Sequence, residues 1–74
     1  MIRDSTGDRL YDEAYDRRGR AYYDAAFTRA AALSHAASPT EVTTAESAYR
    51  QAIRRADEDY CADTNYAASQ ARTA

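Results

Sequence analysis

The sequence predicts an all-α protein built as an antiparallel hairpin of two long helices. Alanine accounts for 18 of the 74 residues and arginine for all ten basic ones, and both residues form helices well. Residues that favour strands are few. One signal that stops a helix and starts another, Ser38-Pro39-Thr40-Glu41, lies near the middle of the chain.

This central stretch defines the predicted turn. Pro39 disfavours helical backbone at the residue before it, so an incoming helix must end by Ser38. Ser38 is a suitable N-cap, Pro39 suits the first helical position, and the carboxylate of Glu41 can reach back to the cap. We therefore predict one helical-hairpin domain over 1–74, with a first helix over about 6–37, a turn at 37–39 and a second helix over about 39–70.

The first helix is predicted to begin at a cap on Ser5 or Thr6. Apolar residues then recur at helical spacing and form one broad stripe: Leu10, Tyr11, Ala14, Tyr15, Ala21, Tyr22, Ala25, Ala26, Ala32 and Leu33. Gly19 interrupts the helix at a cost of about 1 kcal/mol relative to alanine. It lies on the flank of the stripe, where close approach of another helix would explain it.

The second helix has a matching stripe: Val42, Ala45, Tyr49, Ala52, Ile53, Ala56, Tyr60, Ala67 and Ala71. Three pairs of opposite charge lie four residues apart and are expected to form ion pairs on a solvated face: Glu46–Arg50, Arg54–Glu58 and Arg55–Asp59. Asp63, Thr64 and Asn65 are poor helix formers in succession, so fraying or a kink is expected there.

Alanine and tyrosine dominate both stripes, so an isolated hairpin would bury little apolar area. We expect two copies to assemble into a homodimeric four-helix bundle, or one copy to dock on a larger partner.

Composition excludes several classes of protein. The net charge of −2, with acids and bases interleaved, is not the basic footprint of a general DNA-binding protein. The longest apolar run, Ala30 to Leu33, is far too short to span a membrane, and the first residues lack the apolar core of a secretion signal. A single cysteine cannot form an intrachain disulfide, which favours a reducing cytoplasm. No cofactor or metal site is expected.

Arg18 and Arg29 project from the apolar stripe of the first helix. In a hairpin that turns near residue 37, Arg18 lies level with Asp57 and Arg29 with Glu46. Salt bridges across the helices are one interpretation. The alternative is an anion site at an oligomer seam that binds RNA or a nucleotide, since guanidinium groups suit phosphate.

The other polar residues of interest are interpreted as structural, and no catalytic residue is predicted. Asp63 is level with Tyr11, whose hydroxyl could donate a hydrogen bond to it. His35 lies in the last turn of the first helix, where a cation is favourable. Cys61 is expected to be a half-buried small side chain rather than an activated nucleophile.

Tyr23 and Phe27 point away from the main stripe and, with Ala30, form a second apolar patch flanked by Arg20 and Asp16. Clustered exposed aromatic residues mark interfaces. The leading hypothesis is thus a non-enzymatic helical protein that binds a larger protein and inhibits or tethers it. Its most concrete form is a phage-encoded inhibitor of host machinery such as an anti-CRISPR, because small, mildly acidic helical proteins are common in that class.

Overall fold

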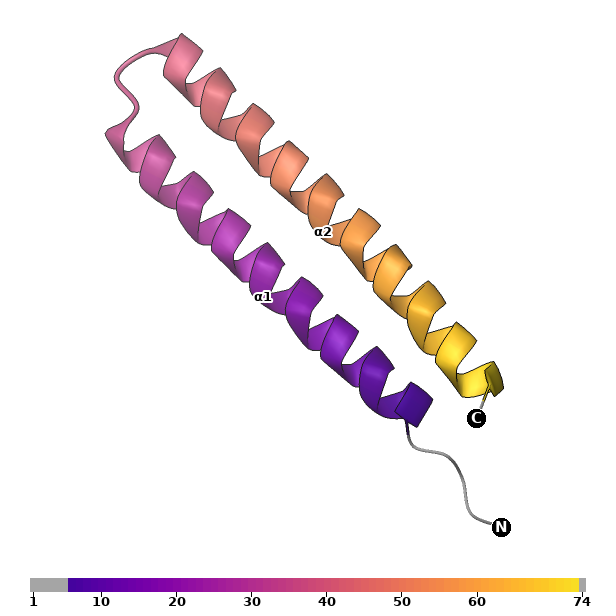
Figure 1. The fold of residues 1–74 in the computed structure, drawn as a ribbon. Coiled ribbons are helices and arrows are strands. Elements are labelled where there is room, and N and C mark those ends of the chain that lie inside the picture. Colours follow the sequence, from indigo (N-terminus) through magenta and orange to yellow (C-terminus); the bar gives the residue numbers. More distant parts are fainter. Residues whose placement is uncertain (1–5, 74) are drawn as a thin grey trace.

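The computed structural model describes residues 6–73 of the chain, with side chains over 8–72. It contains two helices, α1 (Thr6–His35) and α2 (Pro39–Thr73). They lie side by side and antiparallel, so the start of α1 and the end of α2 share one end of the hairpin (Figure 1). The predicted all-helical hairpin is confirmed. The cap expected on Ser5 or Thr6 lies outside the described side chains.

The turn closes through the predicted residues. The Ser38 hydroxyl accepts a hydrogen bond from the backbone N–H of Glu41 at 3.2 Å, which satisfies one of the free donors at the start of α2. The Glu41 carboxylate accepts a hydrogen bond from the backbone N–H of Ala37 at 3.0 Å. The capping box is therefore present, although the acidic side chain reaches one residue further back than the cap itself.

The first helix ends at His35, earlier than the predicted end near 37. The backbone N–H of Ala36 donates to the carbonyl oxygen of Leu33 at 3.3 Å and closes the last turn. The N–H of Ala37 is already used by Glu41. The chain needs residues 36–38 to reverse direction, because Pro39 keeps the residue before it out of the helical region.

The second helix continues to Thr73, past both its predicted end near 70 and the expected weak point. The expectation of fraying or a kink at Asp63, Thr64 and Asn65 is wrong, because α2 runs through these residues without a break (Figure 1). The Thr64 hydroxyl donates to the carbonyl oxygen of Tyr60 at 2.9 Å, so its hydrogen bond is formed within the helix. Asp63 forms an ion pair with Arg17 of α1 at 3.0 Å, which ties this part of α2 to its neighbour.

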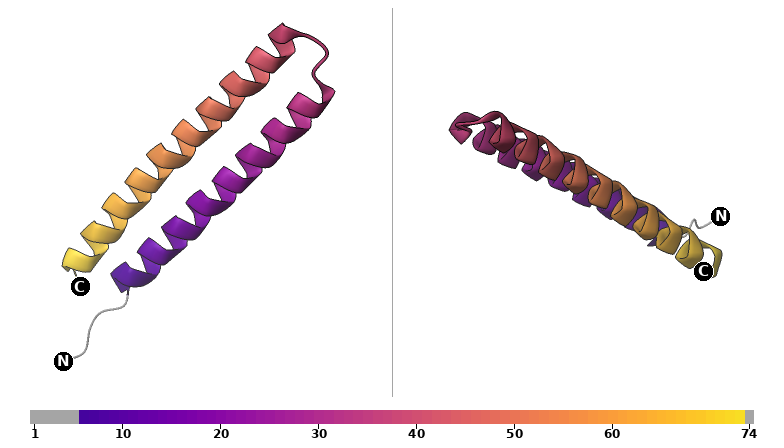
Figure 2. Two further views of the ribbon diagram at one scale, coloured as in Figure 1. Left: turned by 180° about the vertical axis from the view of Figure 1, so that it is seen from behind. Right: turned by 90° about the horizontal axis from the view of Figure 1, so that it is seen from above.

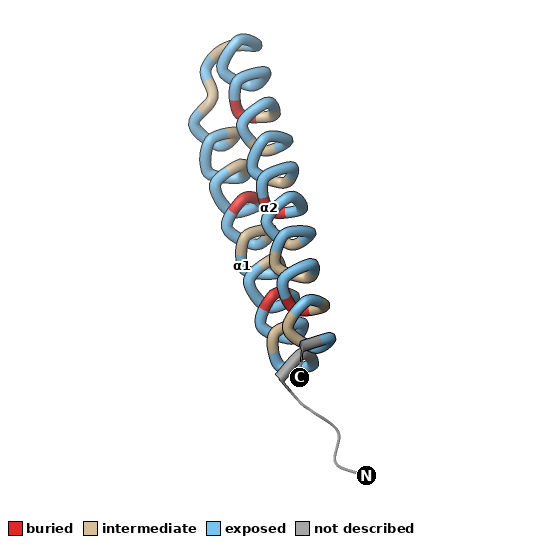
Figure 3. The backbone as a smooth tube through the Cα atoms, turned by 45° about the vertical axis from the view of Figure 1, so that its right-hand side comes forward, coloured by how far each residue is buried: buried red, intermediate tan, exposed pale blue. Residues whose placement is uncertain are grey.

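The seam between the helices is made of alanine. The buried apolar side chains of the described chain are Ala14, Ala25, Ala45, Ala56 and Ala67. On each helix they follow one another at intervals of eleven residues. Eleven residues fill three turns at 3.67 residues per turn, close to the 3.6 of a straight helix, so the buried positions stay in line along the contact. Figure 3 shows these buried segments recurring along the line where α1 and α2 meet.

The buried seam is narrower than the stripes that the sequence predicts. Tyr15 and Val42, both assigned to those stripes, are 61% and 41% exposed, and Ala26 and Ala71 are also exposed. Seen from above, the molecule is a single layer of two helices (Figure 2). Each helix therefore has one neighbour, and only a thin strip of its surface is covered.

Neither α1 nor α2, taken over the described residues, contains a stretch apolar enough and long enough to cross a membrane.

Candidate binding surfaces

The aromatic patch predicted on α1 lies on the side of the helix that faces away from α2. Tyr23 and Phe27 expose 71% and 68% of their surface, the largest values among the exposed large apolar residues. Tyr23, Arg20 and Asp16 line one shallow surface groove, and Phe27 follows Tyr23 by one turn. The structure thus places the four predicted partner-binding residues on one exposed face of α1.

Gly19 forms part of this groove, between Tyr15 and Tyr23. A Cβ atom added at Gly19 would have no neighbour within 4 Å, so nothing in the described chain requires glycine at this position. The sequence predicts that Tyr15 belongs to the buried stripe, but it is exposed and joins the outer face of α1 instead. Its position one turn before Gly19, with Tyr23 one turn after, gives the groove two aromatic walls and an open floor. Tyr15, Gly19 and Tyr23 follow one another at intervals of four residues, and this spacing could have indicated the groove from the sequence. It was hidden because Tyr15 also fits the spacing of the apolar stripe.

Arg29 forms the predicted salt bridge across the hairpin. Its guanidinium group lies 2.7 Å from the carboxylate of Glu46, and its Nε donates a second hydrogen bond to the same oxygen at 3.0 Å. The Tyr49 ring is beside the guanidinium group, with its centroid 5.3 Å away. The hydrogen bond from Arg29 lowers the pKa of Glu46.

Arg18 lies against aromatic rings. Its guanidinium carbon is 3.8 Å from the centroid of the Tyr60 ring, and the rings of Tyr15 and Tyr22 are within 6 Å. Asp57, the expected partner of Arg18, instead accepts a hydrogen bond from the Tyr22 hydroxyl. That hydrogen bond, with a smaller contribution from desolvation, raises the pKa of Tyr22.

The two arginine clusters are related by the same eleven-residue interval as the buried alanines. Arg29, Glu46 and Tyr49 on one level correspond to Arg18, Asp57 and Tyr60 on the next. In both, an arginine of α1 lies over a tyrosine of α2. The eleven-residue spacing of the arginines on α1 and of the tyrosines on α2 could have predicted from the sequence that both clusters share this arrangement.

Several smaller expectations are corrected by the structure. Asp63 is paired with Arg17 rather than with Tyr11, because the register of the two helices places Asp63 level with Arg17. Cys61 is exposed rather than half-buried. None of the three ion pairs expected along α2 forms within the described residues; Glu46, for example, is taken by Arg29. His35 is exposed in the last turn of α1, as the sequence predicts.

Comparison with known proteins adds no assignment. The chain matches no protein-family model, no curated protein and no solved structure. In the part of the chain that the structure describes, no group of three or more histidine, cysteine, aspartate or glutamate side chains is placed to hold a metal ion.

The Arg29–Glu46 pair predicts a pH dependence of stability. The lowered pKa of Glu46 means that the pair stabilises the folded chain above the ordinary glutamate pKa of about 4.3. This stabilisation is lost as the pH falls through the lowered value. In thermal unfolding followed by circular dichroism, we expect Glu46→Gln to reduce Tm near neutral pH and to flatten its decline below about pH 4.

Glu58→Gln is the matched control, since Glu58 is exposed and forms no ion pair within the described residues. Wild-type and Glu46→Gln proteins whose Tm values fall in parallel with acid would show that the ion pair does not contribute.

Proposed function

We propose that this protein is a non-enzymatic helical interaction protein of the cytoplasm that binds a larger protein and inhibits or tethers it. The observation that supports this most is the exposure of Tyr23 and Phe27 on the side of α1 that the hairpin does not use. A few buried residues supply most of the binding energy of a protein interface, and aromatic side chains are enriched among them. A phage-encoded inhibitor of host machinery, such as an anti-CRISPR, is the most concrete form of the proposal.

The charged residues beside the aromatic patch favour a partner whose own binding surface carries both a positive and a negative group at its edge. Asp16 and Arg20 lie one turn apart beside the two aromatic residues, and both are exposed. Polar residues at the rim of an aromatic patch set the orientation of the partner, while the rings provide the buried contact area. The open floor at Gly19 can accept a projecting apolar side chain of that partner.

The proposal includes self-association of the hairpin, in the form of a dimeric four-helix bundle. The buried apolar side chains of the described residues are alanines, and larger apolar side chains such as Tyr15 and Val42 remain exposed. Pairing two hairpins is the usual way to cover exposed apolar side chains.

The alternative, an RNA- or nucleotide-binding oligomer that uses Arg18 and Arg29, has weaker support. Arg29 already holds Glu46 in a two-bond contact, so a phosphate would have to displace a carboxylate there. Only Arg18, stacked on Tyr60, has no acidic partner within the described residues.

Phe27→Ala tests the docking face. The partner would first be identified by affinity capture from lysate of the source cells, and its affinity then measured by calorimetry. We expect the substitution to weaken binding by on the order of 2 kcal/mol, roughly 30-fold in Kd, with unchanged helicity because Phe27 takes no part in the seam. Tyr66→Ala on α2 is the matched control, as Tyr66 is also a largely exposed aromatic residue. Equal affinities for wild type and Phe27→Ala would rule out this face.

Gly19→Ala separates stability from binding. Alanine in a helix interior is favoured over glycine by about 1 kcal/mol, and the added methyl group meets nothing in the chain. We therefore expect a higher Tm together with weaker binding of the partner, because the methyl group fills the floor of the groove. A variant that is more stable but binds as wild type would show that the partner does not enter the groove.

A further inference from the structure

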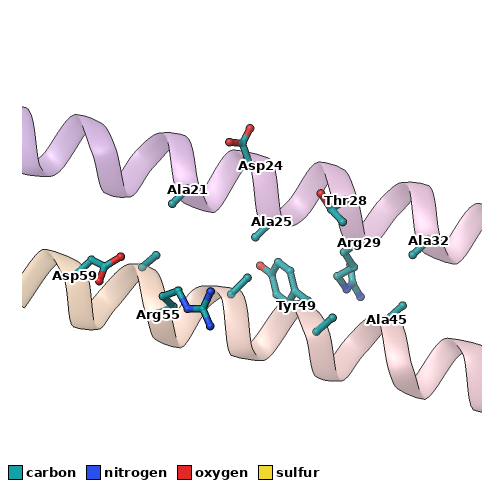
Figure 4. Close-up of a pocket in the computed structure, with 13 residues that line it drawn as sticks. Ala21, Asp24, Ala25, Thr28, Arg29, Ala32, Ala45, Tyr49, Arg55 and Asp59 are labelled. Atoms are coloured by element: carbon teal, nitrogen blue, oxygen red, sulfur yellow. The ribbon is translucent and has the colours of Figure 1, made fainter.

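An open groove of about 400 Å³ runs between α1 and α2 on one side of the hairpin. Seven alanines line it, among them Ala21, Ala25, Ala52 and Ala56, and Figure 4 shows their short side chains on both helices. Side chains this small let another pair of helices approach at the short end of the usual interaxial range of about 8–10 Å. The groove therefore permits the close approach of a second pair of helices.

The rim of this groove carries charges that the chain itself does not neutralise. Asp24, Arg55 and Asp59 line the groove but form no ion pair or hydrogen bond within the described residues. In Figure 4 the Asp24 side chain points away from α2. The polar groups that bridge the two helices elsewhere, such as Tyr22 with Asp57, are satisfied within the chain. The charges of the rim are thus available to a second molecule.

The signs of these charges fit a copy of the same rim. Contacts across the hairpin, such as those of Tyr22 with Asp57 and Arg17 with Asp63, set the register of α1 against α2. In that register Arg55 lies near the level of Asp24. Asp59 lies one turn before Asp63, the ion-pair partner of Arg17, so Arg17 is already neutralised within the chain. At the level of Asp24 the unpaired charges of the rim are negative on α1 and positive on α2.

We infer that the occupant of the groove is a second copy of this chain, related by a twofold axis parallel to the helices. This symmetry places α1 of one copy against α2 of the other at the same level, with all neighbouring helices antiparallel. Asp24 then faces Arg55 of the second copy, and this pair of opposite charges occurs twice across the interface.

The narrow seam agrees with this pairing. The buried apolar side chains of the described residues are alanines, and Ala48 and Ala52, which line the groove on α2, are exposed. A second copy seated on the groove would cover these side chains.

This inference rests on the self-association included in the proposed function, and it specifies the surface used. Tyr23 and Phe27 lie on the side of α1 away from α2 and do not line the groove. In the dimer they stay exposed, once on each copy. The assembly would accordingly present two identical docking faces to its partners.

Reversal of single charges tests the pairing. We expect wild type to sediment as a dimer at micromolar concentration, and Asp24→Arg and Arg55→Asp to dissociate at least about tenfold more readily, because each places like charges together twice. Arg54→Asp makes the same charge change one residue away, at an exposed position outside the groove, and should remain dimeric. Circular dichroism of each variant confirms that the helices are retained.

An equimolar mixture of Asp24→Arg and Arg55→Asp should restore the dimer as a heterodimer, because both cross-copy pairs between residues 24 and 55 again have opposite signs. A twofold axis perpendicular to the helices would instead set Asp24 against Arg17, and mixing would not restore assembly.

Single variants as dimeric as wild type, or a mixture that stays dissociated, would overturn the inference while leaving the proposed self-association standing. A monomeric wild type would overturn both, and binding of the partner to Phe27→Ala would still decide the docking face separately.

Discussion

The structure depends on a seam in which, over the described residues, the buried side chains are alanines. A methyl group lets two helices approach closely, and the eleven-residue spacing keeps the methyl groups in line over the length of the hairpin. The same choice limits what the contact can contribute, because each methyl group removes little apolar area from water. The choice of alanine thus brings the two helices close together but buries little apolar area between them. Both effects leave the larger side chains outside the seam.

Because the seam has no room for large side chains, tyrosine and arginine lie along its edges and beyond. At the edges they hold the helices together by directed contacts, with Arg29 on Glu46 and Arg18 stacked on Tyr60. Away from the seam, Tyr23 and Phe27 remain in water. The interaction function that we propose and the narrow core thus have a common origin, since residues that cannot enter the seam are available for binding.

Much of the hairpin could be predicted because its signals are local. Pro39 with its capping residues positions the turn, and alanine content with helical spacing predicts the helices. The pairing of Arg29 with Glu46 followed from the position of the turn alone. The width of the core could not be predicted, because periodicity identifies the face of a helix but not how much of that face a single neighbour covers. For that reason Tyr15 was placed inside, although it is exposed. The partner of Asp63 could not be predicted either, because the register of α1 against α2 shifts with distance from the turn: Arg29 faces Glu46, whereas Arg17 faces Asp63.

The dependence of thermal unfolding on chain concentration tests most directly whether this thin seam needs a second copy. If folding and assembly are coupled, a hundredfold increase in concentration should raise Tm by roughly 10 °C, as mass action requires for a dimer of this size. Circular dichroism melts over the micromolar range would show the increase. A Tm that stays constant over that range, together with a sedimenting mass of 8.2 kDa, would contradict the account, because the alanine seam would then suffice alone.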